Sequence, residues 1–345
     1  MIETAQVEPG LAEPLHGSRV LVERFIGDGV DTQTGAAVLE RVKVLTLRVT
    51  TTQACAVVEH LFGALPLVER FFDAAEERLA AVRSGAELAA LAVFTPVPEH
   101  GWGAAALAGE STGRGLRVRG EIRVANHDAD GSIVLVRLRD GGERLAWLAH
   151  DASGVEPRGS RTGGRPRSHA PRWLAVEGAM IAEAHVSRPV TLVAGSELYA
   201  CLERYVSVWA VVALDCARRT VRALRRAART TRACGHPDPF SVSQAVSMDL
   251  TELEIEIELT AAAAARHHAQ AAPHPSGLVL ALTAARAIGT CAATANALRD
   301  HLGVSVDDVL AEDGGAVAIA AHVGGAWMLE NELARAIGLG SSLPR

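Results

Sequence analysis

The sequence predicts an α+β protein in which an N-terminal helical domain (1–91), a β-rich middle domain (92–194) and a C-terminal helical domain (195–345) follow one another. Three observations predict this order. Apolar residues recur at helical spacing in the first zone, in short alternating runs in the second, and in long stripes with steps of three and four in the third. A chain of 345 residues is long enough for roughly two or three domains of ordinary size.

The N-terminal zone has the pattern of helices from about residue 20 to residue 91. Its apolar residues fall at helical spacing, and acidic and basic residues fill the gaps between them. The residues that carry this pattern are Val57, Val58, Leu61, Leu65, Leu67, Phe71 and Phe72. We therefore expect helices in this zone.

The middle zone reads as short strands separated by Gly, Asp and Pro. The segment GLRVRGEIRV (115–124) alternates apolar and polar residues, and IVLVRLR, a DGGE turn and RLAWLAH together predict a β-hairpin over 133–150. The segment SGVEPRGSRTGGRPRSHAP (153–171) is rich in Gly, Pro, Ser and Arg, which predicts an exposed loop.

The C-terminal zone predicts four long helices, at about 197–232, 242–270, 278–300 and 316–337. The first carries one apolar stripe and is far longer than the usual ~11 to 12 residues. Leu253, Ile255, Ile257 and Leu259 alternate with glutamates as a strand would, but alanine-rich sequence follows directly, so we predict a helix there.

Composition excludes several classes of protein. A net charge of -6 argues against a general nucleic-acid binder, which neutralises phosphates with an excess of basic residues. The five cysteines are widely spaced with no CxxC pair, which favours a reducing, cytoplasmic location. The N-terminal segment lacks the pattern of a signal peptide, and the most apolar stretch, 278–298, contains Arg286, so neither secretion nor a membrane span is expected.

Four segments, in this order, resemble segments of the acyl-CoA dehydrogenase family. AVFTPVPEHGWG (92–103) resembles the opening of that family's β domain, and GLRVRGEIRVAN (115–126) resembles a hairpin beneath the flavin in which a glycine separates two strands. HVSRPVTLVAG (185–195) resembles the exit into the first helix of a four-helix bundle. RTTRACGHPDPFSVSQAV (229–246) resembles the turn that joins the first and second bundle helices. The resemblance covers most of the chain and implies the fold order helical domain, β domain, four-helix bundle.

The resemblance also implies FAD bound between the β domain and the bundle, beside an acyl thioester substrate, with a glutamate as the base. The position of the aromatic residue that packs on the flavin aligns with Val124 or a neighbour, and the catalytic Glu-Gly-Thr aligns with 322–324, where no glutamate stands. Glu312 and Asp313 are the carboxylates nearest a glycine pair in that region, so either is a candidate displaced base or simply caps a turn. The candidate cofactor-binding residues are Thr95, Trp102, Arg232, Gln244, Gly314 and Gly315.

Two further clusters have competing interpretations. An arginine stripe (Arg218, Arg222, Arg225, Arg229, Arg232) follows one face of the first C-terminal helix, where it could bind a phosphate or lie in solvent. His267, His268 and His274 predict no metal site, because adjacent histidines on a helix point about 100° apart and no acidic partner has ligand spacing.

Three functions are compatible with the sequence. The first is a flavin-dependent oxidoreductase acting on an acyl thioester, bound to CoA or a carrier protein, or on a related small molecule of specialised metabolism. The second is a flavin-free isomerase, dehydratase or cyclase on the same scaffold, and the third is a non-catalytic partner subunit of a heteromeric dehydrogenase. Apolar stripes longer than one bundle can cover predict an oligomer, either of identical chains or with a paralogue.

Overall fold

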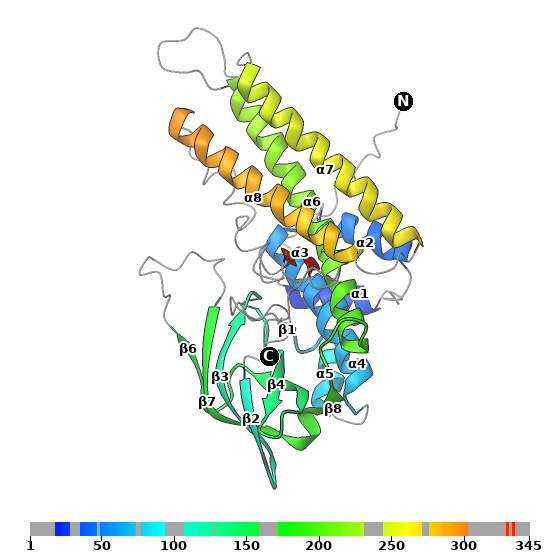
Figure 1. Ribbon diagram of the computed structural model, residues 1–345, viewed down its shortest axis with the longest axis vertical. Coiled ribbons are helices and arrows are strands. Elements are labelled where there is room, and N and C mark those ends of the chain that lie inside the picture. Colours follow the sequence, from blue (N-terminus) through cyan, green and yellow to red (C-terminus); the bar gives the residue numbers. More distant parts are fainter. Residues whose placement is uncertain are drawn as a thin grey trace.

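The computed structural model describes residues 18–27, 35–46, 49–73, 77–93, 107–126, 128–158, 172–230, 244–270, 276–302, 329–330 and 333–334. Long helices form one end of the molecule and a curled β-sheet forms the other, with the shorter N-terminal helices packed between and beside them (Figure 1). Among the described helices, none is long and apolar enough to cross a membrane.

The N-terminal zone is helical, as predicted. Its elements are α1 (Ser18–Gly27), α2 (Gly35–Thr46), α3 (Thr51–Val58), the π-helix η1 (Glu59–Ala64), α4 (Leu65–Phe71) and α5 (Glu77–Ser84). A capping box starts α3, in which the Thr50 side chain accepts from the Gln53 backbone N–H and the Gln53 side chain accepts from the Thr50 backbone N–H. The wide turn of η1 lies just before Pro66, which has no N–H to continue the helical ladder.

The sheet is mixed. Its strands are β1 (Ala89–Ala92), β2 (Leu107–Thr112), β3 (Gly115–Val124), β4 (Gly131–Leu138), β5 (Glu143–Ala149), β6 (Val155–Arg158), β7 (Arg172–Ala182) and β8 (Val186–Val190), with a short 3₁₀ turn, η2 (Glu183–His185), before β8. The strand order is β6-β7-β3-β2-β4-β5-β8, and β1 pairs in parallel with β4. The predicted hairpin over 133–150 is confirmed, because β4 and β5 pair antiparallel.

Three predictions about this zone are wrong. No glycine separates two strands inside GLRVRGEIRV, since β3 runs from Gly115 to Val124; Gly120, in its middle, has a φ of 142°, which glycine adopts without leaving the ladder. Val155–Arg158 is a strand and not a loop, and it tolerates Pro157 because β6 is at the edge of the sheet. At the start of the sheet, Ala89–Ala92 form β1, although the helical pattern was expected to reach residue 91.

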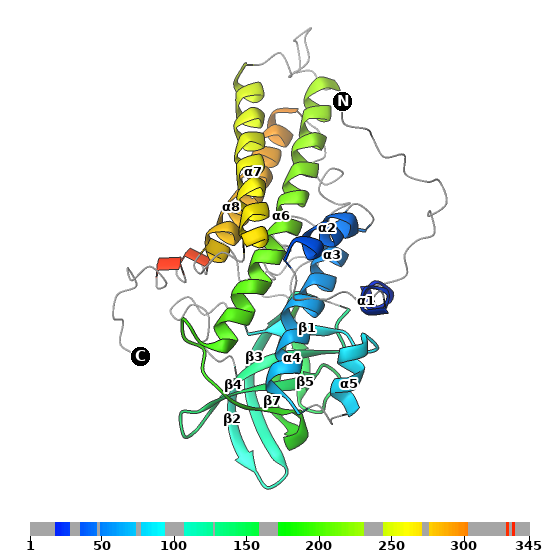
Figure 2. The same cartoon turned by 90° about the vertical axis from the view of Figure 1, so that its right-hand side faces the viewer.

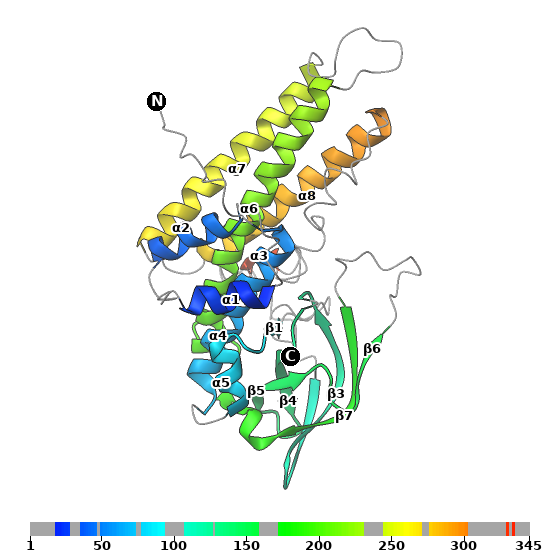
Figure 3. The same cartoon turned by 180° about the vertical axis from the view of Figure 1, so that it is seen from behind.

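The burial of β4 shows how the sheet packs. Ile133 and Leu135 belong to the core shared with the helices, whereas Val134 and Val136 belong to a second core inside the curled sheet. Alternate residues of a strand point to opposite faces, so covering both faces of β4 requires the continuous apolar run IVLV. Figure 3 shows α4 and α5 beside β4 and β5, with β6 and β7 on the far side of the sheet.

The C-terminal zone contains three long described helices, α6 (Glu197–Thr230), α7 (Gln244–Gln270) and α8 (Ser276–Leu302), which lie side by side (Figure 2). The predicted helix starting near residue 197 is confirmed, with 34 residues in α6. The alternating segment 253–259 is helical, as predicted, with Leu253 and Ile257 buried and Ile255 and Leu259 exposed. The fourth predicted helix lies outside the described residues except for 329–330 and 333–334, which are helical.

Part of the arginine stripe of α6 is paired with the acidic run of α7. Arg218 contacts both carboxylate oxygens of Glu258 at 2.7 and 2.8 Å, and Arg225 pairs with Glu254. Glu254 and Glu258 are four residues apart and therefore share one helix face. Arg218 and Arg225 thus join the two helices, which leaves them unsuited to hold a phosphate.

Candidate functional site

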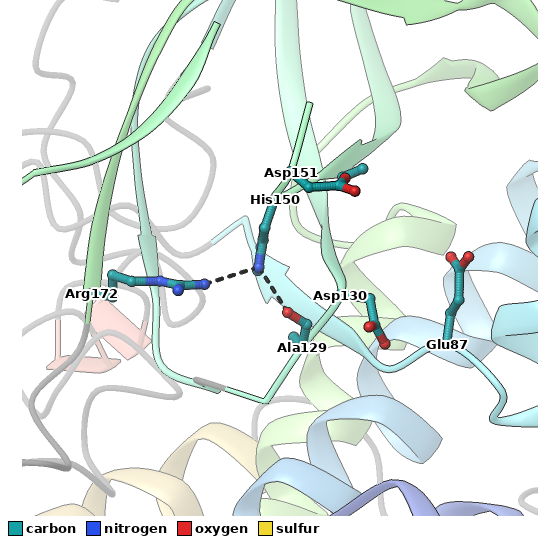
Figure 4. A pocket seen from close by; sticks show the side chains of 7 residues that line it. Glu87, Ala129, Asp130, His150, Asp151 and Arg172 are labelled. Atoms are coloured by element: carbon teal, nitrogen blue, oxygen red, sulfur yellow. Dashed lines mark hydrogen bonds between the residues drawn. The ribbon is translucent and has the colours of Figure 1, made fainter. Parts of the chain in front are cut away.

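A pocket of about 390 Å³ opens beside the ends of several strands of the sheet. Its lining residues come from separate segments that the sheet register brings together: Glu87, Ala129, Asp130, Ala149, His150, Asp151 and Arg172. Gly131 of β4 is paired with Ala149 of β5, and Val124 of β3 with Arg172 of β7, so the pocket lies at the end of both strand pairs. Figure 4 shows Arg172 and His150 pointing toward one another across it.

Asp130 fastens the rim of the pocket to its surroundings. Its carboxylate oxygens lie 2.7 and 2.8 Å from Nη2 of Arg19 on α1, and one of them accepts from the Leu88 backbone N–H at 2.7 Å. Its own backbone N–H donates to the Leu88 carbonyl, and its carbonyl accepts from the His150 N–H, each at 2.9 Å. Through these contacts Asp130 links α1, the residue before β1 and the residue after β5 at the pocket.

His150 is a neutral side chain in a polar network. Its Nε2 is 2.7 Å from the Ser132 hydroxyl, and its Nδ1 is 2.9 Å from the Ala129 carbonyl and 3.1 Å from Nη2 of Arg172. Burial, with the nearby Arg172 cation, lowers the pKa of His150 from 6.5 to about 4. A neutral ring has one N–H, so Nδ1 either donates to Ala129 or accepts from Arg172 and cannot do both.

Arg172 has unused hydrogen-bonding capacity. A guanidinium has five N–H groups, and the described structure gives Arg172 one hydrogen-bond contact, to His150. Its Nε is buried without a hydrogen-bond partner, and no carboxylate of the described residues lies within ion-pair distance of it. The described residues also contain no group of acidic, His and Cys side chains that could hold a metal ion.

Most residues predicted from the resemblance lie outside the described residues. These are Thr95, Trp102, Arg232, Glu312, Asp313, Gly314 and Gly315. Gln244 is the first residue of α7, and its side chain is outside the described part as well. Their roles stay predictions.

The end of β3 shows what stands at the expected flavin position. Val124 is fully buried in the core inside the sheet, so its side chain points away from the helical layer. Two residues further on, Asn126 is also buried; its Oδ1 accepts from the Asp128 N–H at 3.0 Å, and its Nδ2 has no hydrogen-bond partner in the described structure. The site at the end of β3 therefore contains a buried donor that lacks an acceptor.

Sequence reasoning did not single out His150 or Arg172. The predicted hairpin was the usable signal for His150. Pairing of β4 with β5 places His150, which follows β5, next to the residues just before β4. Arg172 could not be found in this way. It begins β7, which pairs with the distant strand β3, and no hairpin in the sequence indicates that pairing.

Comparison with solved structures identifies the fold. No protein-family model matches the chain, and no curated protein matches it in sequence. Among solved structures, the glutaryl-CoA complex of glutaryl-coenzyme A dehydrogenase is similar with a TM-score of 0.71 and 15% identity, covering 93% of this chain and 86% of that one. The chain has the acyl-CoA dehydrogenase fold.

Two further structures with the acyl-CoA dehydrogenase fold support this assignment. The FAD complex of PigA has a TM-score of 0.71 at 13% identity, covering 94% of this chain and 90% of that one. The ChsE4-ChsE5 complex from Mycobacterium tuberculosis has a TM-score of 0.68 at 19% identity, with coverage of 94% and 90%. The resemblance seen in the sequence is thus confirmed at the level of the fold.

Proposed function

We propose that this protein is a divergent, acyl-CoA dehydrogenase-like flavin-dependent oxidoreductase that acts on an acyl thioester, carried by CoA or a carrier protein, or on a related small molecule of specialised metabolism. The observation that carries the proposal is the match in fold over 94% of the chain to the FAD complex of PigA, together with the match to a glutaryl-CoA complex. Bound FAD would supply a hydride acceptor.

The residues at the end of β3 fit a bound cofactor. The buried Nδ2 of Asn126 lacks an acceptor within the described structure, and an unpaired buried donor is costly unless a ligand satisfies it. Asn126 would therefore donate a hydrogen bond to the flavin ring system, and Arg232, just beyond the end of α6, would bind the pyrophosphate. Thr95, Trp102, Gln244, Gly314 and Gly315 complete the proposed cofactor site, with Glu312 or Asp313 as the candidate base.

A second candidate, a flavin-free enzyme or a partner subunit, has a specific observation in its favour. Val124 is buried inside the sheet, so if it rather than a neighbour aligns with the flavin-packing aromatic, that position offers no side chain to a cofactor. The ChsE4-ChsE5 structure is a complex of two different proteins, which supports the partner-subunit version. Flavin binding separates these candidates from the first.

Replacing Arg232 with alanine is expected to weaken FAD binding by about tenfold or more. Charge-assisted hydrogen bonds are worth roughly 1.5 to 3 kcal/mol each, and losing 1.4 kcal/mol is about tenfold in affinity. Arg225→Ala is the matched control, because Arg225 is paired with Glu254 and is not available to a phosphate. The measurement is FAD retained after desalting, read from the visible spectrum, with circular dichroism to check folding. Equal loss in both variants would remove the Arg232 assignment.

We also propose that the chain forms an oligomer through α7. Met248, Ile255 and Leu259 are 53%, 55% and 68% exposed, and their spacing of seven and four places them on one helix face. Exposed apolar stripes of this kind mark protein interfaces.

A double variant, Ile255→Glu and Leu259→Glu, is therefore expected to reduce the oligomer to monomers, because burying two carboxylates in an apolar interface is costly. Mass measured by light scattering after size exclusion tests this. Met180→Glu, on an exposed residue of β7, is the control and should keep the parent mass. A monomeric parent chain, or a double variant of unchanged mass, would contradict the proposal.

A further inference from the structure

The pocket at the strand ends is lined by three carboxylates, Glu87, Asp130 and Asp151, and by one guanidinium, that of Arg172. Asp130 is neutralised by Arg19, and Glu87 is engaged in a contact of its own. Asp151 is exposed at the turn after β5. Arg172 is the cation that lines the pocket, and within the described residues it has no carboxylate partner.

The contact between Arg172 and His150 does not satisfy the guanidinium. The Nδ1 atom of His150 lies 2.9 Å from the Ala129 carbonyl, so when Nδ1 carries the proton it donates to that carbonyl and cannot accept from Arg172. In that state Ser132 donates to Nε2, the histidine is fully paired, and Arg172 has no acceptor at all in the described structure. A ligand with acceptor oxygens would resolve this competition.

We infer that this pocket binds a small oxyanion, a carboxylate or phosphate group, through the guanidinium of Arg172. A planar guanidinium pairs with two oxygens of such a group at once, and charge-assisted bonds of this kind are the strong ones. The volume of about 390 Å³ is within the range of small-molecule pockets. With an anion bound to Arg172, neutral His150 would keep its proton on Nδ1 and donate it to the Ala129 carbonyl. The inference rests on Arg172, His150 and Ala129 and does not require bound flavin.

Titration calorimetry with inorganic phosphate and, separately, with acetate tests the inference on the full chain at constant ionic strength. We expect saturable binding of at least one anion, with a dissociation constant of about 1 mM or below. Binding of phosphate alone or acetate alone identifies the group, and binding of both identifies a general oxyanion site. No saturable binding of either anion would overturn the inference.

Three variants locate the site. Arg172→Gln is expected to raise the dissociation constant by about tenfold or more, and Arg172→Lys by less, because it keeps the charge and loses the planar fork. Arg117→Gln, the same change at an exposed residue of β3, should bind like the parent chain. Unchanged affinity in a folded Arg172→Gln variant would overturn the assignment. If that variant does not fold, the Nε–H resonance of Arg172 in the parent decides, since it must shift with saturation as phosphate or acetate is added, and a constant resonance refutes the site.

Discussion

Acidification from pH 6.5 toward pH 4 is expected to unfold this protein, because three histidines are held neutral inside it. Burial lowers the pKa of His60, His150 and His268 from 6.5 to about 4 in each case. Above pH 6.5 the folded and unfolded states are both neutral at these residues, and their contribution to stability is complete. Between pH 6.5 and pH 4 these histidines bind protons in the unfolded state but stay neutral in the folded state, so stability falls as the pH falls.

The loss is large relative to a typical stability of about 5 to 15 kcal/mol. His60 is fully buried and contributes up to about 3 kcal/mol, and the partly buried His150 and His268 contribute less. Urea unfolding at a series of pH values between 7 and 5 measures the slope. His60→Gln retains an acceptor for the Ala89 N–H without titrating, so we expect its slope to be smaller by up to about 1.4 kcal/mol per pH unit, the limit for one proton. Identical slopes in the parent and this variant would contradict the account.

Replacing Glu59 with leucine is expected to destabilise the fold by about 2 to 4 kcal/mol. Glu59 is fully buried in η1, where its Oε1 accepts from the Leu91 N–H at 2.8 Å, and the next residue, His60, accepts from the Ala89 N–H at 3.0 Å. Both donors are on the side of β1 that does not face β4, so these two side chains act as the missing neighbour strand. Leucine would leave the Leu91 N–H buried and unpaired, which costs about 1 to 3 kcal/mol beyond the lost bond.

Glu59→Gln provides the matched comparison, since its amide oxygen can still accept from Leu91. We expect it to lose less stability than the leucine variant when both are unfolded in urea at neutral pH. A leucine variant as stable as the glutamine variant would show that the hydrogen bond to β1 is not what makes Glu59 necessary.

The helices were the most predictable part of the fold. Apolar residues at steps of three and four identify α6 without further knowledge, and the alternating segment 253–259 was resolved by the alanines that follow it. The strand β6 was not predictable, because Val155–Arg158 has the composition of a loop and is ordered by pairing with β7. Pairing between distant segments is not encoded in local composition.

The candidate site was less predictable than the fold. His150, Asp130 and Arg172 are each ordinary in the sequence, and only the register of β4, β5 and β7 brings them to one pocket. The residues implied by the family resemblance form a second set that lies mostly outside the described residues, and their roles stay predictions. Val124 is the exception, since it is described and is buried in the core inside the sheet.

Binding of FAD by the parent chain tests the central claim most directly. The purified protein is incubated with excess FAD, desalted, and its visible spectrum is compared with its protein concentration. We predict the visible bands of a bound flavin at roughly one FAD per chain. A folded protein that stays colourless after every reconstitution condition would contradict the proposed function and favour a flavin-free enzyme or a partner subunit with the acyl-CoA dehydrogenase fold.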